Sequence, residues 1–190
     1  MADSQSNQIT GYAELLKKFN PAINLLSRKD MDNLMTRHID DGIFSHKSLS
    51  AFERLSSEYP VYDLGSGNGI PGVIWAILSP ETKFILVDTD ERKCEFLKTA
   101  ASRLGISNVT VDCVDFKSIQ PTQNSLFLCR GLTALESFFS ENSAFNNHKG
   151  YFIKGSTWNI ELGQLKPEFF TGLPYKLKDG TERALVIYKK

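Results

Sequence analysis

The segment around residue 65 has residue types and spacing suited to binding a nucleoside-containing ligand. Gly65, Gly67 and Gly69 lack a Cβ atom, so the backbone there can approach a ligand closely. The dinucleotide fingerprint G-x-G-x-x-G requires glycine at position 70, which is Ile70,. Asp63 fits poorly beside a pyrophosphate but can pair with a cation. S-adenosylmethionine carries an ammonium group and no phosphate, so the loop favours this cofactor over NAD.

Other charged residues stand where further strands are expected to end. Asp88 follows the apolar run FILV, near the ~20-residue offset at which an acid meets ribose hydroxyls. Val114-Asp115 follows the next apolar segment, and Asp115 is a candidate acceptor for an adenine amino group. Arg130 and Lys154 stand at the ends of two further predicted strands. Ligands bind outside the carboxyl ends of strands in an open α/β sheet, so these side chains are predicted to line one crevice. Asp88 could instead only cap the following helix, and Asp115 could instead be a solvated acid in a loop with no ligand.

Alternating strand and helix patterns must position these residues. Strands are predicted over 61–64, 84–87, 106–115, 125–129 and 151–153, with helices over 71–78, 90–104 and 133–144 between them,. A C-terminal hairpin is predicted from 175–178 and 183–188 around Asp179-Gly180,. This pattern predicts an α/β, Rossmann-like methyltransferase fold, mostly parallel, with an antiparallel C-terminal hairpin.

The first 58 residues are predicted to form a helical extension packed on a core of residues 59–190 within a single domain. One amphipathic helix is expected to end before Pro21, and a second to begin near Asp30,. The segment 47–60 looks mixed. His38 lies on the apolar stripe of the second helix, which favours a buried, hydrogen-bonded histidine over a catalytic one.

Composition narrows the classes of partner. The 190 residues contain 22 basic and 22 acidic side chains, so a nucleic acid would have to be held by local basic patches. We find no apolar run long enough for a membrane span and no secretory signal, and cytoplasmic residence is expected. Cys94, Cys113 and Cys129 are widely spaced without a CxxC pair, which predicts buried small hydrophobic residues and no metal or disulfide.

Several motifs together resemble one family, the bacterial small-subunit (16S) ribosomal RNA guanine-N7 methyltransferases, also called glucose-inhibited division protein B. The motifs are FNPAINLLS at 19–27, RHIDDG at 37–42, DLGSGNGIPG at 63–72, CRG at 129–131, FIKG at 152–155 and ERALVIYK at 182–189. The resemblance covers nearly all of the chain after residue 11. The stretch before Asp115 is shortened by about two residues, and Cys113 stands where the family often has Arg.

The resemblance implies specific roles for residues of this chain. Cofactor contacts are implied at Gly65, Ile70, Asp88, Val114-Asp115 and Arg130. Arg37, His38, Asp41, Lys154 and Arg183 are implied to shape the site or to meet RNA. The implied substrate is a guanine in the decoding-region loop of 16S rRNA, within a largely assembled small subunit.

Guanine N7 carries a lone pair and no proton, so its methylation needs placement rather than a general base. Arg130, Lys154 and Arg37 are therefore the candidate catalytic residues, with Arg130 ordering cofactor and substrate. Its alternative is a structural ion pair with Asp63 or Asp88. Candidate phosphate contacts are Lys17-Lys18, Arg28-Lys29, Arg37, Arg92-Lys93, Lys154 and Arg183,.

A monomer without metal is expected. The residues alone are compatible with two other functions. The protein could transfer a methyl group from S-adenosylmethionine to another substrate, or it could be a non-catalytic RNA-binding assembly factor that has kept the fold. An NAD-dependent dehydrogenase is disfavoured by Ile70 and Asp63.

Overall fold

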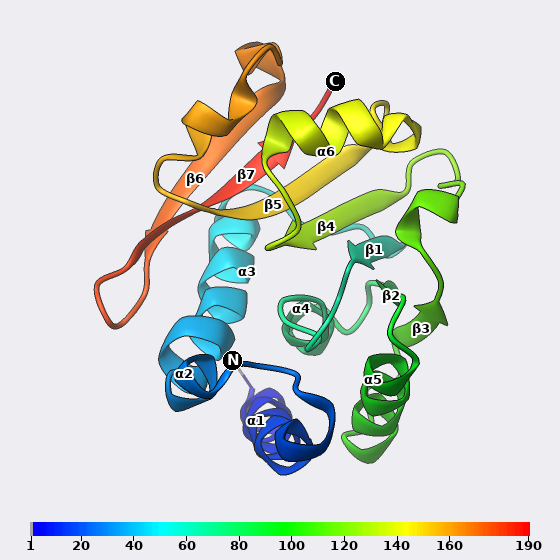
Figure 1. The fold of residues 1–190 in the computed structure, drawn as a ribbon, viewed down its shortest axis with the longest axis vertical. Helices are drawn as coiled ribbons and strands as arrows, with labels where there is room; N and C mark the ends of the chain where they lie inside the picture. Colours follow the sequence, from blue (N-terminus) through cyan, green and yellow to red (C-terminus); the bar gives the residue numbers. More distant parts are fainter. Residues whose placement is uncertain (1) are drawn as a thin grey trace.

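The computed structural model describes residues 2–190, which form one seven-stranded sheet with helices on both faces (Figure 1). The strands are β1 (Val61–Leu64), β2 (Phe84–Asp88), β3 (Val109–Cys113), β4 (Leu126–Arg130), β5 (Lys149–Gly155), β6 (Phe170–Lys176) and β7 (Glu182–Tyr188). The α-helices are α1 (Asp3–Ile23), α2 (Arg28–Asp32), α3 (Asp40–Phe52), α4 (Gly72–Leu78), α5 (Glu91–Arg103) and α6 (Leu135–Glu141). A π-helix, η1 (Leu34–Ile39), precedes α3, and 3₁₀ turns are η2 (Phe116–Ser118), η3 (Ser143–Phe145), η4 (Trp158–Leu162) and η5 (Pro167–Phe169).

The strand order is β3-β2-β1-β4-β5-β7-β6, with β1 to β5 parallel and β7 antiparallel to both of its neighbours. The register pairs Leu64 with Val87 on one side and with Cys129 on the other. The carboxyl ends of β1, β2 and β4 therefore lie side by side. Strand order reverses direction between β1 and β4, which is where open α/β sheets bind ligands. The predicted fold class and C-terminal hairpin are confirmed, but the first hairpin strand is β6 (Phe170–Lys176) and not 175–178, and β3 is shorter than the predicted 106–115.

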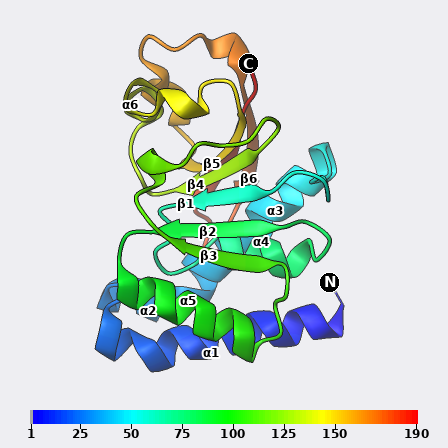
Figure 2. The same ribbon diagram turned by 90° about the vertical axis from the view of Figure 1, so that its right-hand side faces the viewer.

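Apolar residues divide into two clusters, one on each face of the sheet. Helices α1, α3, α4 and α5 cover one face, and α6 with the 3₁₀ turns covers the other (Figures 1 and 2). On the second face, the Phe127 ring on β4 packs against Phe138 and Phe152 at centroid distances of 5.5 and 5.4 Å. Figure 2 shows α1 lying along α5 at the β3 end of the molecule. The inner parallel strands β1, β2, β4 and β5 are thus mostly buried on both sides, as expected for this class of sheet, whereas the edge strand β3 has no buried residue,.

The N-terminal helix extends further than predicted. Helix α1 contains Pro21 and ends at Ile23, so the prediction of an end before Pro21 was wrong. Pro21 lies in the last turn of α1 and has no N–H to donate to the carbonyl four residues earlier, so the helix ends two residues later,. The helix then stops because Asn24 takes a left-handed conformation, with φ 50°, and donates its N–H to the carbonyl of Asn20 at 2.9 Å,.

The second predicted helix is a chain of three helical segments. Ser27 caps α2 by accepting a hydrogen bond from the Asp30 N–H at 3.1 Å,. The helix then passes through η1 into α3, which continues to Phe52. Residues 47–52 are therefore helical and not mixed as expected. The π-helical segment matters because it contains Arg37 and His38, and π-helical geometry is often found at functional sites.

Helix α6 is shorter than the predicted 133–144, and a separate 3₁₀ turn follows it. Within residues 2–190, none of the helices is both long and apolar enough to span a bilayer.

Candidate functional site

The glycine loop between β1 and α4 is a tight backbone turn. Gly65, Gly67 and Gly69 have φ values of 67, 55 and 75°, a region that residues with a Cβ rarely adopt. The N–H of Gly69 donates to the carbonyl of Ser66 at 2.7 Å. A Cβ at Gly67 would approach only the Gly65 carbonyl oxygen, at 3.8 Å. The loop is thus held internally and leaves open space above Gly67 for a ligand.

Helix α1 supports this loop from beneath through a contact that the sequence did not reveal. The Tyr12 hydroxyl donates to the carbonyl oxygen of Asn68 at 2.5 Å, and the Asn68 side chain accepts from the N–H of Ile70 at 3.0 Å. Tyr12 is fully buried. Its place on the apolar face of α1 marked it as a core residue, but no sequence signal indicated the loop as its partner.

Asp63 lies at the end of β1 under the loop and is 1% exposed. Burial raises the pKa of its carboxyl to about 7,. Among the residues that the structure describes, none hydrogen-bonds its Oδ2 atom. A buried acid with an unsatisfied oxygen suits a cationic ligand group, because pairing with a positive charge would stabilise the ionised carboxylate.

Asp88 and the segment after β3 flank the loop on its other side. Asp88 Oδ2 accepts from the N–H of Gly67 at 2.7 Å, and Oδ1 from the N–H of Asp90 at 2.9 Å. Asp90, rather than Asp88, caps α5 through the Arg92 N–H at 2.9 Å. Val114 is exposed, and Asp115 accepts from the Lys117 N–H at 2.9 Å to begin η2. The structure therefore brings Asp88 to the loop and leaves Val114-Asp115 as an open rim.

Arg130, at the end of β4, forms a buried ion pair with Asp41 of α3. The Arg130 Nε atom lies 2.9 Å from Asp41 Oδ2, and Asp41 is 1% exposed. The alternative role considered for Arg130 was a structural ion pair with Asp63 or Asp88, and the structure gives Arg130 an ion pair with a different partner, Asp41. Asp41 lies in the first turn of α3, a helix that packs against β6, β7 and α4.

Two more side chains converge on the same carboxylate. Arg183 of β7 lies with its Nη2 atom 3.0 Å from Asp41 Oδ2, and the Tyr175 hydroxyl donates to Asp41 Oδ1 at 2.6 Å. Asp41 therefore fixes two guanidinium groups beside each other, with one carboxylate charge against two positive charges. Tyr175 was not singled out from the sequence, since its position in a hairpin strand carries no functional signal.

His38 completes this cluster as a buried, neutral ring. Burial and the neighbouring Arg130 lower the pKa of His38. Its Nδ1 atom accepts from Arg130 Nη2 at 3.1 Å, and Nε2 lies 3.4 Å from Asp30 Oδ1. The prediction of a buried, hydrogen-bonded histidine is confirmed.

A cavity of about 410 Å³ opens beside this cluster. Its lining residues are Arg130, Gly131, Ile153, Lys154, Gly155, Glu161 and Arg183. Lys154 Nζ lies 2.7 Å from Glu161 Oε2, and the lysine side chain is 12% exposed. Arg37 lies outside the cavity, with its Nε atom 2.9 Å from Asp179 Oδ2 in the turn between β6 and β7. The structure thus groups Arg130, Lys154 and Arg183 and separates Arg37 from them.

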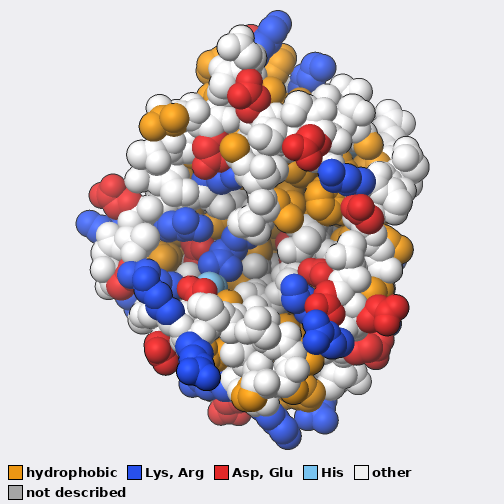
Figure 3. Space-filling model, viewed as in Figure 1, with side chains coloured by type: hydrophobic (Ala, Val, Ile, Leu, Met, Phe, Trp, Pro, Cys, Tyr) orange, Lys and Arg blue, Asp and Glu red, His pale blue; other side chains and the backbone are white. Residues whose placement is uncertain are grey.

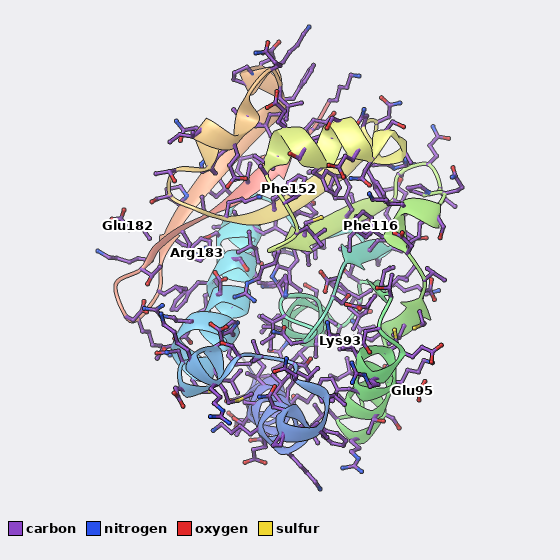
Figure 4. All side chains as sticks on the ribbon, viewed as in Figure 1. Lys93, Glu95, Phe116, Phe152, Glu182 and Arg183 are labelled. Atoms are coloured by element: carbon purple, nitrogen blue, oxygen red, sulfur yellow. The ribbon has the colours of Figure 1, made fainter. Side chains whose placement is uncertain are left out.

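The figures show this crevice face-on. In the space-filling view, basic side chains lie on both sides of a hollow near the middle of the face (Figure 3). Figure 4 places Arg183 on the side of α3 and Lys93 on the side of α5. Acidic side chains lie beside these basic ones, so both signs of charge flank the hollow in a chain that has no net charge (Figure 3).

One of the three cysteines departs from the sequence prediction. Cys94 and Cys129 are buried, but Cys113 is exposed, because β3 is the edge strand and its end has no cover. Residues 2–190 contain no group of three or more His, Cys, Asp or Glu side chains placed to hold a metal ion.

Comparison with known proteins identifies the family of this chain. A protein-family model described as rRNA small subunit methyltransferase G matches residues 5–177 of this chain. The chain belongs to this family. A curated protein of that name from Ruegeria sp. (strain TM1040) is 39% identical over 157 residues, 80% of this chain and 73% of that protein. One from Ruegeria pomeroyi is 36% identical over 157 residues, 80% of this chain and 74% of its own.

The fold agrees with a solved structure described as a SAM-dependent methyltransferase from Aquifex aeolicus. That structure has a TM-score of 0.54 at 16% identity, and the match covers 76% of this chain and 89% of that chain. The protein is thus an S-adenosylmethionine-dependent methyltransferase of small-subunit rRNA, and the predicted cofactor is confirmed. The residues fit that cofactor, since the loop is open above Gly67 and Asp63 offers a buried, unsatisfied carboxyl oxygen.

Proposed function

We propose that the protein transfers the methyl group of S-adenosylmethionine to N7 of a guanine in 16S rRNA, within the small ribosomal subunit. The observation that carries this proposal is the composition of the cavity beside Arg130. Among the residues described, Glu161 is the only acidic one lining it, and Glu161 is paired with Lys154. The cavity therefore offers no free general base, which suits an acceptor nitrogen that has no proton to lose.

Different residues of the chain contact different parts of the cofactor. Gly65, Gly67 and Gly69 allow close approach of the loop, and Asp63 meets the ammonium group. Asp88 accepts from the ribose hydroxyls, exchanging its present hydrogen bond from Gly67. Ile70 packs under the loop, since it is 3% exposed. The sulfonium group supplies an activated methyl, and Val114-Asp115 borders the adenine side.

Catalysis then depends on placement. Holding the acceptor nitrogen in line with the donor can contribute up to ~7–11 kcal/mol. Arg130 lies between the end of β4 and the cavity with its Nε and Nη2 atoms already bonded to Asp41 and His38. Its guanidinium plane is therefore fixed before substrate arrives, which favours orientation of the guanine or of its phosphate.

Lys154 and Arg183 supply the remaining positive charge of the cavity, and Arg37 contributes from the nearby rim. Lys154 also donates to the carbonyl oxygen of Thr133, which ties the segment after β4 to β5. We assign Lys154 to cavity shape and charge. Arg37, half exposed and next to the β6–β7 turn, suits a phosphate of the RNA backbone.

A direct test uses small subunits from a strain lacking this protein. The subunits are incubated with purified protein and S-adenosylmethionine carrying a labelled methyl group, and the RNA is then cleaved chemically at 7-methylguanosine. We expect label at a single guanine. Arg130→Lys keeps the charge but loses the planar fork, and should reduce transfer at least tenfold.

Lys98→Gln is the matched control, because Lys98 is exposed on α5 and pairs only locally with Glu95 at 2.8 Å. It should transfer methyl groups like the unmodified protein. Label that resists the cleavage chemistry would place the methyl group at another atom and contradict N7. Cofactor binding with no label in the RNA would favour a different substrate, and absence of cofactor binding would favour an assembly factor.

A further inference from the structure

A second cavity, of about 780 Å³, lies at the amino-terminal ends of the parallel strands, opposite the ends that carry the glycine loop. It is lined by the first residues of β4 and β5, Leu126 and Lys149, and by the segment that follows α3. The carboxyl ends of the same two strands carry Arg130 and Lys154. The two cavities are therefore separated by the length of the parallel strands, and nothing in the methyl-transfer site uses the second one.

The lining of this cavity is one-sided in charge. It includes Arg54, Lys149, Lys189 and Lys190, and among the described residues that line it there is no Asp or Glu. Lys149 forms an ion pair with Glu53, which also accepts from the Tyr151 hydroxyl at 2.9 Å. Arg54, Lys189 and Lys190 are exposed and form no ion pair with any part of residues 2–190. Three unmatched positive charges thus gather here in a chain of zero net charge.

The backbone around these cations is well fixed. Lys149 pairs in register with Leu126 across β4 and β5. The N–H of Lys189 donates to the Phe169 carbonyl at 2.9 Å. Asn124, at the tip of the turn before β4, has φ 71°, and its exposed amide lies in the lining. Neutral amide donors beside Lys and Arg on a fixed backbone suit phosphate and sugar groups of a nucleic acid.

We propose that this cavity, formed by Arg54, Asn124, Lys149, Lys189 and Lys190, is a second RNA-contact surface that binds phosphodiester groups distant from the target nucleotide. The inference rests on the proposed function, in which the substrate is rRNA within a folded particle. β5 runs from Lys149, in the lining of this cavity, to Gly155, in the lining of the cavity beside Arg130, so these two residues lie ~20 Å apart at about 3.3 Å per residue. That is roughly the length of six stacked base pairs at about 3.4 Å each. Only an extended or folded RNA reaches both.

The test compares two charge-neutralised proteins. Lys189→Gln with Lys190→Gln removes two cations from the cavity. Lys98→Gln with Lys166→Gln removes two exposed cations outside it. Binding to unmethylated small subunits is measured between about 50 and 300 mM salt, alongside cofactor affinity and thermal unfolding. For every lysine–phosphate interaction that a substitution removes, the slope of log affinity against log salt should fall by about 1.

We expect the first variant to bind the subunit about tenfold or more weakly at the lowest salt, with its slope reduced by about 2 and its cofactor affinity unchanged. The control should bind like the unmodified protein. Equal slopes and affinities in all three proteins would overturn the RNA contact and leave the cavity to another anion, such as an acidic protein segment. Equal weakening in both variants would overturn it too, by showing a general charge effect.

Failure of this inference is separable from failure of the proposed function. The label-transfer assay on the unmodified protein decides whether the subunit is methylated at N7. The salt-dependent binding assay decides whether the second cavity contacts RNA, and it requires no methyl transfer.

Discussion

The Asp41 carboxylate on α3 holds the Arg130 guanidinium at the end of β4, with an Oδ2–Nε distance of 2.9 Å across 89 positions of the chain. Arg183 and Tyr175 bond the same carboxylate. One buried acid from the N-terminal helices thus sets the orientation of two arginines that line the cavity proposed for methyl transfer.

Asp41→Asn should destabilise the protein and impair transfer. Removing one partner of a buried ion pair leaves unpaired charges and typically costs about 3 kcal/mol. We expect that decrease in the free energy of unfolding measured with urea, together with a large fall in methyl transfer. Asp179→Asn is the control, because Asp179 pairs with the half-exposed Arg37 and its substitution should leave stability nearly unchanged. Equal stability of the two variants would contradict the role of Asp41.

Tyr12→Phe should weaken cofactor binding through the glycine loop. The change removes the hydrogen bond to the Asn68 carbonyl, costing about 1 kcal/mol of stability, and frees the loop. We expect the cofactor Kd from calorimetry to rise several-fold. Tyr188→Phe removes a comparable bond, to the Asn146 carbonyl at 2.6 Å on the opposite face of the sheet. It should be destabilised to a similar extent but bind cofactor normally; a rise in Kd for both would argue against a local effect.

The proposed pairing of Asp63 with the cofactor's ammonium predicts pH-dependent binding. With its pKa raised to about 7 by burial, Asp63 is largely protonated at about pH 6 and must release its proton when the ammonium binds. Affinity should therefore rise about fivefold from about pH 6 to about pH 7, in line with the change in ionised fraction. Calorimetry in buffers of different ionisation enthalpy measures the released proton. Asp63→Asn should bind more weakly and without this pH dependence, and an unchanged dependence would assign the proton elsewhere.

Cys113 should react much faster with thiol reagents than the other two cysteines. It is exposed, whereas burial raises the pKa of Cys94 to about 12 and that of Cys129 well above its ordinary value. Titration of the native protein with a chromogenic disulfide should show one fast thiol, and denaturant should reveal all three. Cys113→Ser should remove the fast phase. Bound cofactor should slow it, since Val114-Asp115 follows directly; two fast thiols would contradict the burial of Cys94.

The sequence by itself determined the order of the strands, the glycine loop and the charged residues at strand ends, but not the bounds of β3 and β6. These features depend on short-range periodicity and on glycine's freedom at positive φ, both of which are visible within about ten residues. Once strands are known to be parallel, their carboxyl ends must meet, so Asp63, Asp88, Arg130 and Lys154 could be placed at one edge in advance.

The tertiary structure alone decided which side chains pair. The partner of Arg130 is Asp41 and not Asp63 or Asp88, the support of the loop is Tyr12, and Cys113 is left uncovered at an edge strand. The first two depend on where α1 and α3 lie against the sheet, which is fixed by the packing of whole helical faces, and the third depends on β3 being the edge strand. Residues that pair across 56 to 89 positions leave no local pattern, because only the folded core brings them within hydrogen-bonding distance.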